Sequence, residues 1–296
     1  MDTRDLEYLL AVERCGSIGK AADALGMSQP ALTKAVQRLE TQVGVTLFER
    51  TANGMIPTPA GGRFIARAQR ITLEFDDAMQ EMRAIQGGEQ GVVRIGYSPT
   101  VPNALVLGAS RQLIRERPAA KLQLRCRLAR ELLDMLAAGE LDLVVAPAPA
   151  RPDSAIATVE LFHDRLSVLA DESHPLQRKR GLTLADLADQ EWLLPDTTIP
   201  VRRQIDDAFR ARGLPGPRLR VETDFGSTSL LHLLRGTPLL CVGGTEALDQ
   251  LDGLRVLDLR ADELELRRRI AAMHRAGAYV PPLAQRMITL LQARVK

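Results

Sequence analysis

Three short helical segments, each followed by a single glycine, constrain the fold of the first 44 residues more than any other feature. Apolar residues recur at helical spacing before Gly16, again before Gly26, and along residues 28–43 before Gly44. A glycine ends a helix readily because it accepts the left-handed backbone conformation that a tight turn requires. Helix, short turn, helix is the helix-turn-helix arrangement, and the order of the segments predicts one here.

The third segment, residues 28–43, has two chemically different faces. Its apolar face is made of Leu32, Val36, Leu39 and Val43. The opposite face carries Gln29, Thr33, Lys34, Gln37 and Arg38. Such side chains pair with base edges in the major groove of DNA, and a threonine methyl contacts thymine. A solvated polar face is the alternative, but the short preceding turn places this helix outward and favours the reading of DNA.

A hairpin and a capped helix are predicted next. Asn53-Gly54 is a strong turn signal, which predicts a small two-stranded wing able to lie on the phosphate backbone or in the minor groove. Thr58-Pro59 predicts a helix cap followed by a proline at the first helical position. We expect that helix to run to about Gln86 and to stop at Gly87-Gly88.

This long helix carries a coiled-coil repeat. Its apolar positions are Phe64, Ala68, Ile71, Phe75, Ala78, Met82 and Ile85. They are separated alternately by four and three residues, which is the spacing of a seam between two helices. A helix packed on its own domain is the alternative. We favour dimerisation, because so small a domain cannot cover a helix roughly 40 Å long.

From Val92 onward the pattern changes to strands alternating with helices. The predicted strands cover residues 92–97, 122–126, 141–146, 166–170, 192–194, 219–222 and 239–242. Helices are predicted at 131–138, 202–212, 227–235 and 282–296. Alternation of this kind predicts an α/β region with mostly parallel pairing, large enough to divide into two lobes. The fold class is therefore α followed by α/β.

The composition says more about the cellular compartment of the protein than about its binding partners. The formal net charge of +2 implies nothing about nucleic acid, so any DNA site depends on where the charge lies. Aromatic residues make up 3% of the chain, which disfavours a stacking surface for single strands. The three cysteines are far apart, which indicates a reducing compartment. The start of the chain lacks a signal-peptide pattern, and no apolar run is long enough to span a membrane, so we expect a cytoplasmic protein.

At this point the residues resemble a known family. The match is carried by Ala21-Ala22, Leu25, Ser28 to Thr33, Leu39-Glu40, Gly44 to Arg50 and Thr58 to Gly61, and more loosely by Leu136, Gly139 and Leu141-Asp142. In this order and spacing they resemble the signature of LysR-type transcriptional regulators. The resemblance is dense over about residues 1–65 and looser to the end of the chain.

The resemblance implies an architecture and a set of partners. It implies a winged helix-turn-helix over 1–58, a linker helix over 59–88, and a two-lobed effector domain similar to type 2 periplasmic binding proteins over 91–296, with lobe I at 91–161 and 266–296 and lobe II at 162–265. The expected partners are double-stranded promoter DNA, other copies of the chain in a dimer of dimers, a small-molecule effector and RNA polymerase. The implied DNA-binding residues are Gln29, Pro30, Thr33, Lys34, Arg38 and Arg50.

The effector is expected between the two lobes, where loops lead into helices. The candidate residues are Ser98, Thr100, Arg127, Thr197, Thr198, Phe225 and Ser227. Helix N-termini with nearby hydroxyl groups attract anions, and arginine matches a carboxylate, so the sequence predicts an organic anion. Arg202 and Arg203 are further candidates to reach the same cleft. Ordinary helix caps, a core phenylalanine and solvated arginines are the alternatives.

Rival functions find little support in these residues. An enzyme is not expected, because the four histidines lack metal-ligand spacing and the chain contains no phosphate-binding loop, dinucleotide fingerprint or nucleophile elbow. We therefore assign no catalytic residue, metal or cofactor. Redox sensing by Cys126 is disfavoured, since no second cysteine is positioned as a resolving partner. A stand-alone metabolite-binding protein leaves the first 90 residues unexplained.

Overall fold

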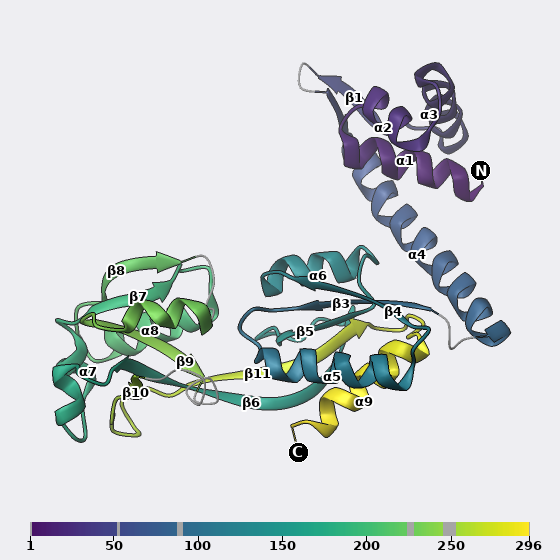
Figure 1. Ribbon diagram of the computed structural model, residues 1–296. Coiled ribbons are helices and arrows are strands. Elements are labelled where there is room, and N and C mark those ends of the chain that lie inside the picture. Colours follow the sequence, from purple (N-terminus) through teal and green to yellow (C-terminus); the bar gives the residue numbers. More distant parts are fainter. Residues whose placement is uncertain (1, 52–53, 88–90, 224–227, 245–252, 296) are drawn as a thin grey trace. The chain divides into compact units, whose positions relative to one another are not determined.

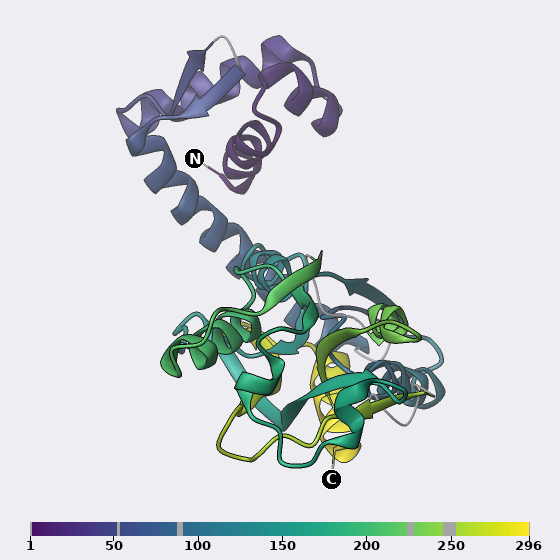
Figure 2. The ribbon, with the colours of Figure 1, turned by 90° about the vertical axis from the view of Figure 1, so that its left-hand side faces the viewer.

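The first three helices end at the glycines that the sequence indicated. A computed structural model describes residues 2–51, 54–87, 91–223, 228–244 and 253–295 (Figures 1 and 2). In it, α1 covers Thr3–Cys15, α2 covers Ile18–Leu25 and α3 covers Gln29–Val43. Gly16, Gly26 and Gly44 follow them in the left-handed conformation, with φ of 60°, 64° and 74°. The predicted helix-turn-helix is confirmed.

The wing is a two-stranded antiparallel hairpin attached to the end of α1. It consists of β1 (Phe48–Thr51) and β2 (Gly54–Pro57), as predicted, while Asn53 lies outside the described residues (Figure 2). The Met55 amide donates a hydrogen bond of 2.8 Å to the Gly16 carbonyl. One glycine therefore both ends α1 and anchors the wing.

The long helix α4 (Pro59–Gly87) begins in close contact with the wing. Thr58 Oγ1 accepts a hydrogen bond of 2.9 Å from the Gly61 amide, so the predicted cap is confirmed. The Thr58 amide donates to the Leu47 carbonyl at 2.9 Å. A Cβ atom on Gly61 would lie 1.9 Å from that same oxygen, so only glycine fits there.

The repeat along α4 divides into two parts. Phe64 and Ala68 pack into the core of the N-terminal helices, as the own-domain alternative expects. Farther along, Ile71, Phe75 and Met82 each remain 49% exposed. This second part presents apolar surface that the chain's described residues leave open.

The C-terminal region contains two groups of parallel strands. The first group is β3 (Val92–Tyr97), β4 (Lys121–Cys126) and β5 (Leu143–Pro147), and the second is β7 (Glu191–Pro195), β8 (Arg218–Thr223) and β9 (Leu239–Gly244). The remaining elements are α5 (Asn103–Glu116), α6 (Ala129–Ala137), η1 (Pro175–Arg178), α7 (Leu184–Leu187), α8 (Pro200–Ala211), η2 (Thr228–Leu234), β10 (Leu254–Val256) and α9 (Pro282–Ala293).

Two long strands join the groups, and they pair antiparallel. They are β6 (Ile156–Asp171) and β11 (Leu266–Arg275), which run through both halves of this unit in Figure 1. The strand order is β4-β3-β5-β11-β6-β9-β7-β8, with β10 beside β6. The expected parallel pairing holds within each group, but the centre of the sheet is antiparallel because a chain that passes between lobes twice must return.

Each half has its own hydrophobic core. In one, α5 and α9 pack on the sheet face that carries Val93, Ile95 and Val145, while α6 covers the face of Val144 and Ala146. In the other, the largest cluster surrounds Trp192 and Phe209, whose rings meet edge to face at 6.3 Å. No helix in the described part of the chain is long and apolar enough to cross a membrane.

The contact between Gly61 and Leu47 leads to a stability prediction. Gly61→Ala forces a methyl group into the Leu47 backbone and should destabilise the N-terminal unit by about 1–3 kcal/mol or more. Gly62→Ala meets nothing within 4 Å and should stabilise the helix by about 0.5–1 kcal/mol. Hydrogen exchange of residues 3–51 in the full chain measures both effects. Equal exchange in the two variants contradicts the prediction.

Candidate functional site

The polar face of α3 is exposed, and the opposite face is buried. Leu32, Ala35, Val36 and Leu39 lie in the core. Gln29, Pro30, Lys34 and Gln37 are all exposed. The hydroxyl of Thr33 donates to the Gln29 carbonyl at 2.9 Å. Because that hydroxyl already donates its proton within the helix, Thr33 can offer an outside partner only its methyl group and an accepting oxygen.

Arg38, predicted as a DNA-binding residue, is held by a carboxylate of α1. Its Nη2 donates to Asp5 Oδ1 at 2.5 Å; the arginine side chain is 59% exposed and the aspartate 4%. Burial disfavours the charged Asp5, but hydrogen bonds from Arg38 and from the Asp2 amide outweigh it and lower the pKa of Asp5. Asp5 also completes a capping box with Asp2. Arg38 therefore fixes α3 against the start of α1.

Two further side chains complete this unit. Arg50 lies on β1 and is exposed, as a contact to phosphate requires. Glu40, which sequence reasoning used only for the resemblance, accepts hydrogen bonds from the amides of Leu47 at 2.7 Å and Phe48 at 3.3 Å. This carboxylate joins α3 to the wing. Its role depends on a tertiary contact that no local sequence signal reveals.

In the C-terminal unit, strand direction brings the candidate loops together. The register shows that β6 runs from the β5 side to the β9 side, and that β5 and β9 run toward one another. The carboxyl ends of both parallel groups therefore face each other across the crossing strands β6 and β11. Ligands bind at the carboxyl ends of parallel strands because helix N-termini gather there.

The first of these edges holds Ser98, Thr100 and Arg127. Ser98 is 3% exposed, and its hydroxyl lies 2.9 Å from that of Thr100. Arg127 follows β4; its Nη1 donates to the Cys126 carbonyl at 2.8 Å and its Nε lies 4.0 Å from Glu131. The Arg127 side chain is 57% exposed. Its guanidinium is therefore accessible to an anion.

The second edge holds Thr197 and Thr198 in the turn between β7 and α8. The Thr198 amide donates to Asp196 Oδ1 at 2.6 Å, and hydrogen bonds from the Thr198 side chain and amide lower the pKa of Asp196. Neither threonine caps α8, because Ile199 occupies the cap position. The other candidates on this side, Phe225 and Ser227, lie outside the described residues.

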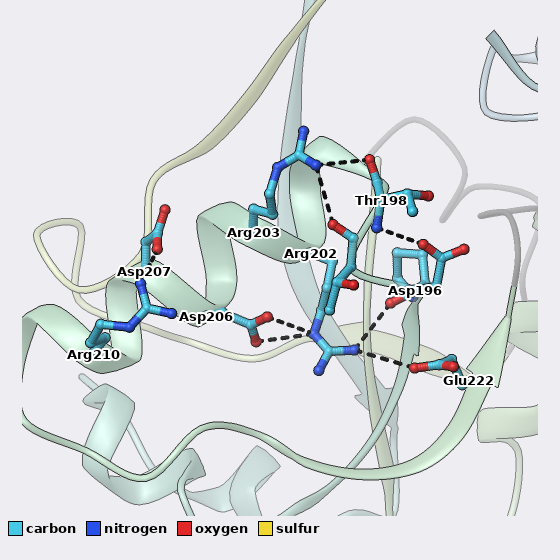
Figure 3. A network of polar contacts seen from close by, with 10 residues as sticks. Asp196, Thr198, Arg202, Arg203, Asp206, Asp207, Arg210 and Glu222 are labelled. Carbon is cyan, nitrogen blue, oxygen red and sulfur yellow. Dashed lines mark hydrogen bonds and ion pairs between the residues drawn. The ribbon is translucent and has the colours of Figure 1, made fainter. Parts of the chain in front are cut away.

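The arginines of α8 are engaged within the protein (Figure 3). Arg202 is 11% exposed; its Nε donates to both oxygens of Asp206, its Nη1 donates to the Pro195 carbonyl, and Glu222 lies 3.9 Å away. Arg203 donates to the carbonyls of Thr197 and Thr198 at 3.2 and 3.0 Å. Both residues shape the turn; Arg203 is exposed, as Arg127 is, whereas Arg202 is largely enclosed.

Helix N-termini supply the other positive potential at these edges. The cap positions of α5, α6 and α8 are Pro102, Leu128 and Ile199, and none of them makes a side-chain capping hydrogen bond. By contrast, α1 and α7 are closed by the capping boxes of Asp2 and Thr183. Uncapped N-termini retain free amides and the positive end of the helix dipole, a combination that favours an anion.

An ion pair between the crossing strands is the main feature that the sequence did not indicate. Arg268 of β11 donates from Nε to Asp164 Oδ2 of β6 at 2.7 Å, and from Nη2 to the Thr100 carbonyl at 2.9 Å. The Asp164 side chain is 8% exposed. Within the run Arg267-Arg268-Arg269, sequence alone does not show which arginine turns inward.

The cysteines and histidines form no further site in the described ranges. Cys126 is exposed at the end of β4, and Cys15 lies in the other unit. Cys241 is buried, and burial raises the pKa of its thiol to about 12, which keeps it protonated. Across the residues that the structure describes, no three histidine, cysteine, aspartate or glutamate side chains are grouped as a metal site.

Comparison with known proteins covers both units. Residues 3–62 match the family described as bacterial regulatory helix-turn-helix protein, lysR family, and residues 86–296 match the LysR substrate binding domain. A probable hydrogen peroxide-inducible genes activator of Streptomyces viridosporus is 35% identical over 217 residues, 73% of this chain and 69% of its own. The HTH-type transcriptional regulator YybE of Bacillus subtilis is 27% identical over 96% of each chain.

Solved structures share the fold over the whole chain. A full-length OxyR variant from Pseudomonas aeruginosa has a TM-score of 0.73 at 24% identity and covers 99% of this chain and 95% of its own. The LysR family regulator CbnR, in complex with its target DNA, has a TM-score of 0.63 at 24% identity over the full length of both chains.

The pair of Arg38 and Asp5 leads to a pH-dependent stability prediction. Arg38→Ala should lower the thermal midpoint of the N-terminal unit at pH 7, because it leaves a buried carboxylate without its guanidinium. The lowered pKa of Asp5 stabilises the fold above its unfolded pKa of about 3.9, and this stabilisation is lost as the pH falls through the folded pKa. The difference in thermal midpoint between Arg38→Ala and wild type should therefore become smaller as the pH is lowered.

The control for this prediction is Gln37→Ala, an exposed neighbour on the same helix. Thermal unfolding of the three full-length proteins between pH 7 and acid provides the comparison. A midpoint for Arg38→Ala that equals that of Gln37→Ala at pH 7 contradicts the structural role of Arg38.

Proposed function

Because the chain belongs to the LysR family of DNA-binding transcriptional regulators, we propose that α3 reads a promoter sequence in the major groove and that a small organic anion controls this binding. The observation that carries the proposal is the exposed polar face of α3, held outward by a buried apolar face and by the Arg38–Asp5 pair. Helix-turn-helix proteins place the second helix of the motif in the major groove, with its N-terminal residues on the base edges.

Arg38 stays a predicted DNA contact, and each of the other DNA-binding residues has a distinct proposed part. Gln29 and Lys34 reach base edges from the first turns of α3, and Thr33 offers its methyl group to thymine. Pro30, exposed at the start of α3, adds an apolar contact. Arg50 approaches phosphate from the wing, where a guanidinium contributes affinity rather than sequence preference.

We propose that the chain acts as a dimer of dimers. The exposed side chains of Ile71, Phe75 and Met82 recur at coiled-coil spacing along α4, and a second copy of that helix covers them. Pairing of two α3 helices matches a two-fold symmetric operator with half-sites on one side of the duplex. A change in this arrangement on effector binding alters the contact with RNA polymerase.

The proposed effector site lies between the facing carboxyl edges of lobe I (91–161 and 266–296) and lobe II (162–265). Separate hydrophobic cores on either side support two lobes, although the cores place Phe162 with lobe I and Leu266 with lobe II, a few residues from the predicted bounds. Arg127 and the uncapped N-termini of α5, α6 and α8 favour a carboxylate, while the hydroxyls of Ser98, Thr100, Thr197 and Thr198 add donors. Phe225 and Ser227 stay sequence predictions for the same site.

The proposed reading of DNA is tested at Lys34. Lys34→Ala should weaken binding of the full chain to duplex DNA from its own upstream region by about 1–3 kcal/mol, the usual range for a good base contact. Lys121→Ala removes the same charge from the exposed start of β4 and should leave affinity unchanged. Fluorescence anisotropy at fixed salt measures both. Equal affinities for Lys34→Ala and wild type contradict the role of Lys34.

The proposed anion site is tested by ligand-induced stabilisation. The thermal-shift panel contains mono- and dicarboxylic acids, each beside its neutral amide. We expect the carboxylates to raise the midpoint of thermal unfolding. A ligand at 100 times its Kd adds about 2.7 kcal/mol to the free energy of unfolding. Arg127→Ala should abolish most of the shift, whereas Arg115→Ala, in the last turn of α5 and away from the site, should keep it. Stabilisation by the neutral amides alone contradicts an anionic effector.

A further inference from the structure

A charged contact joins three elements where the crossing strands pass from one lobe to the other. Asp164 and Arg268 are direct partners in the register of β6 and β11. Phe162 and Ile270 on one side of the pair pack in the core of lobe I. Leu166 and Leu266 on the other side pack in the core of lobe II. The ion pair therefore occupies the boundary between two separately packed bodies.

The pair is enclosed from both edges. On the lobe I side, Arg268 Nη2 donates to the Thr100 carbonyl at 2.9 Å. On the lobe II side, Gly244 ends β9 so close to the carboxylate that a Cβ atom there would lie 3.0 Å from Asp164 Oδ1. The Arg268 side chain is 21% exposed. One guanidinium and one carboxylate thus contact both facing carboxyl edges at once.

Arginine suits this position better than lysine. The planar guanidinium carries donors in a fixed fork, so Nε and Nη2 bind Asp164 while Nη2 also holds Thr100. A buried carboxylate and its partner are held tightly, because separating them leaves a charge that water does not solvate. When Thr100 moves, either the hydrogen bond between its carbonyl and Arg268 must break or the strands β6 and β11 must move with it.

We propose that Arg268 is a positioning residue that couples the Ser98–Thr100 loop to the angle between the lobes. The inference rests on the proposed function in that this loop binds the effector. Thr100 offers its hydroxyl to the site and its carbonyl to Arg268. An anion that draws the two hydroxyls toward itself moves the carbonyl relative to the guanidinium, and β11 transmits the movement to lobe II.

The neighbouring arginines provide matched controls. Arg267 and Arg269 flank Arg268 on the same strand, are 55% and 46% exposed, and pair with Glu265 and Glu160. Substituting either one removes the same charge from the same strand without touching Thr100 or Asp164. These two variants therefore show the general effect of losing a charge or strand stability. The effect of Arg268 binding to Asp164 and Thr100 is what remains.

The coupling is tested by the distance between lobes in the full chain, without effector or DNA. Nitroxide labels at Ala137→Cys on α6 and Arg178→Cys on η1 report that distance by pulsed electron paramagnetic resonance, in a background of Cys15→Ser and Cys126→Ser with labelled chains diluted in unlabelled ones. We expect one narrow distribution for wild type, Arg267→Gln and Arg269→Gln. Arg268→Lys should broaden the distance distribution about twofold or more, because the lysine keeps a positive charge beside Asp164 but loses the hydrogen bond to the Thr100 carbonyl.

A second variant guards against misfolding. Asp164→Asn with Arg268→Gln removes both charges together, so no buried carboxylate is left without a partner. This double variant should broaden the distance distribution as much as Arg268→Lys does. Wild-type widths in both this double variant and Arg268→Lys overturn the proposal. Because the measurement uses neither ligand nor promoter, it succeeds or fails independently of whether carboxylates bind and of whether α3 reads DNA.

Discussion

The C-terminal unit depends on the antiparallel crossing of β6 and β11. Because these strands run in opposite directions through both lobes, the parallel groups beside them also run in opposite directions. Their carboxyl ends consequently face one another, and so do the uncapped N-termini of α5, α6 and α8. The positive potential on both sides of the proposed effector site is thus a consequence of strand direction and requires no cluster of basic side chains.

The N-terminal unit follows a different principle, in which backbone contacts do the positioning. Gly16, Leu47 and Gly61 lie where α1, the wing and α4 meet, and their main-chain atoms make the contacts. Glu40 adds a side chain that binds the wing's amides. Because the buried face of α3 and Glu40 hold the helix in place, its exposed side chains, apart from Arg38, are not needed to position it. Substitutions on that face can therefore change its surface chemistry without changing the fold.

Sequence alone predicted the elements whose signals are local. Glycine stops, the Thr58 cap and the alternation of apolar residues each act within a few positions, and the corresponding helices and strands are present. It missed β11 and the first part of β6, because a strand at the junction of two lobes is not apolar throughout. The three consecutive arginines at 267–269 obscure a strand whose pleat turns one of them inward and two outward. Which arginine forms the bridge depends on register, a property of the partner strand.

The fates of the arginines show why residue type is a weak guide to an anion site. Sequence offered Arg127, Arg202 and Arg203 as candidates, yet each of them donates to a carboxylate or carbonyl of its own segment, and Arg202 is only 11% exposed. A guanidinium satisfied in this way gains little from a ligand, because binding would exchange one set of hydrogen bonds for another. Arg127 is itself bound to the Cys126 carbonyl and lies near Glu131, so the helix amides that no side chain caps gain most from a ligand. The proposal of an anion site in this chain therefore depends more on groups left unsatisfied by the fold than on groups that merely carry the right charge.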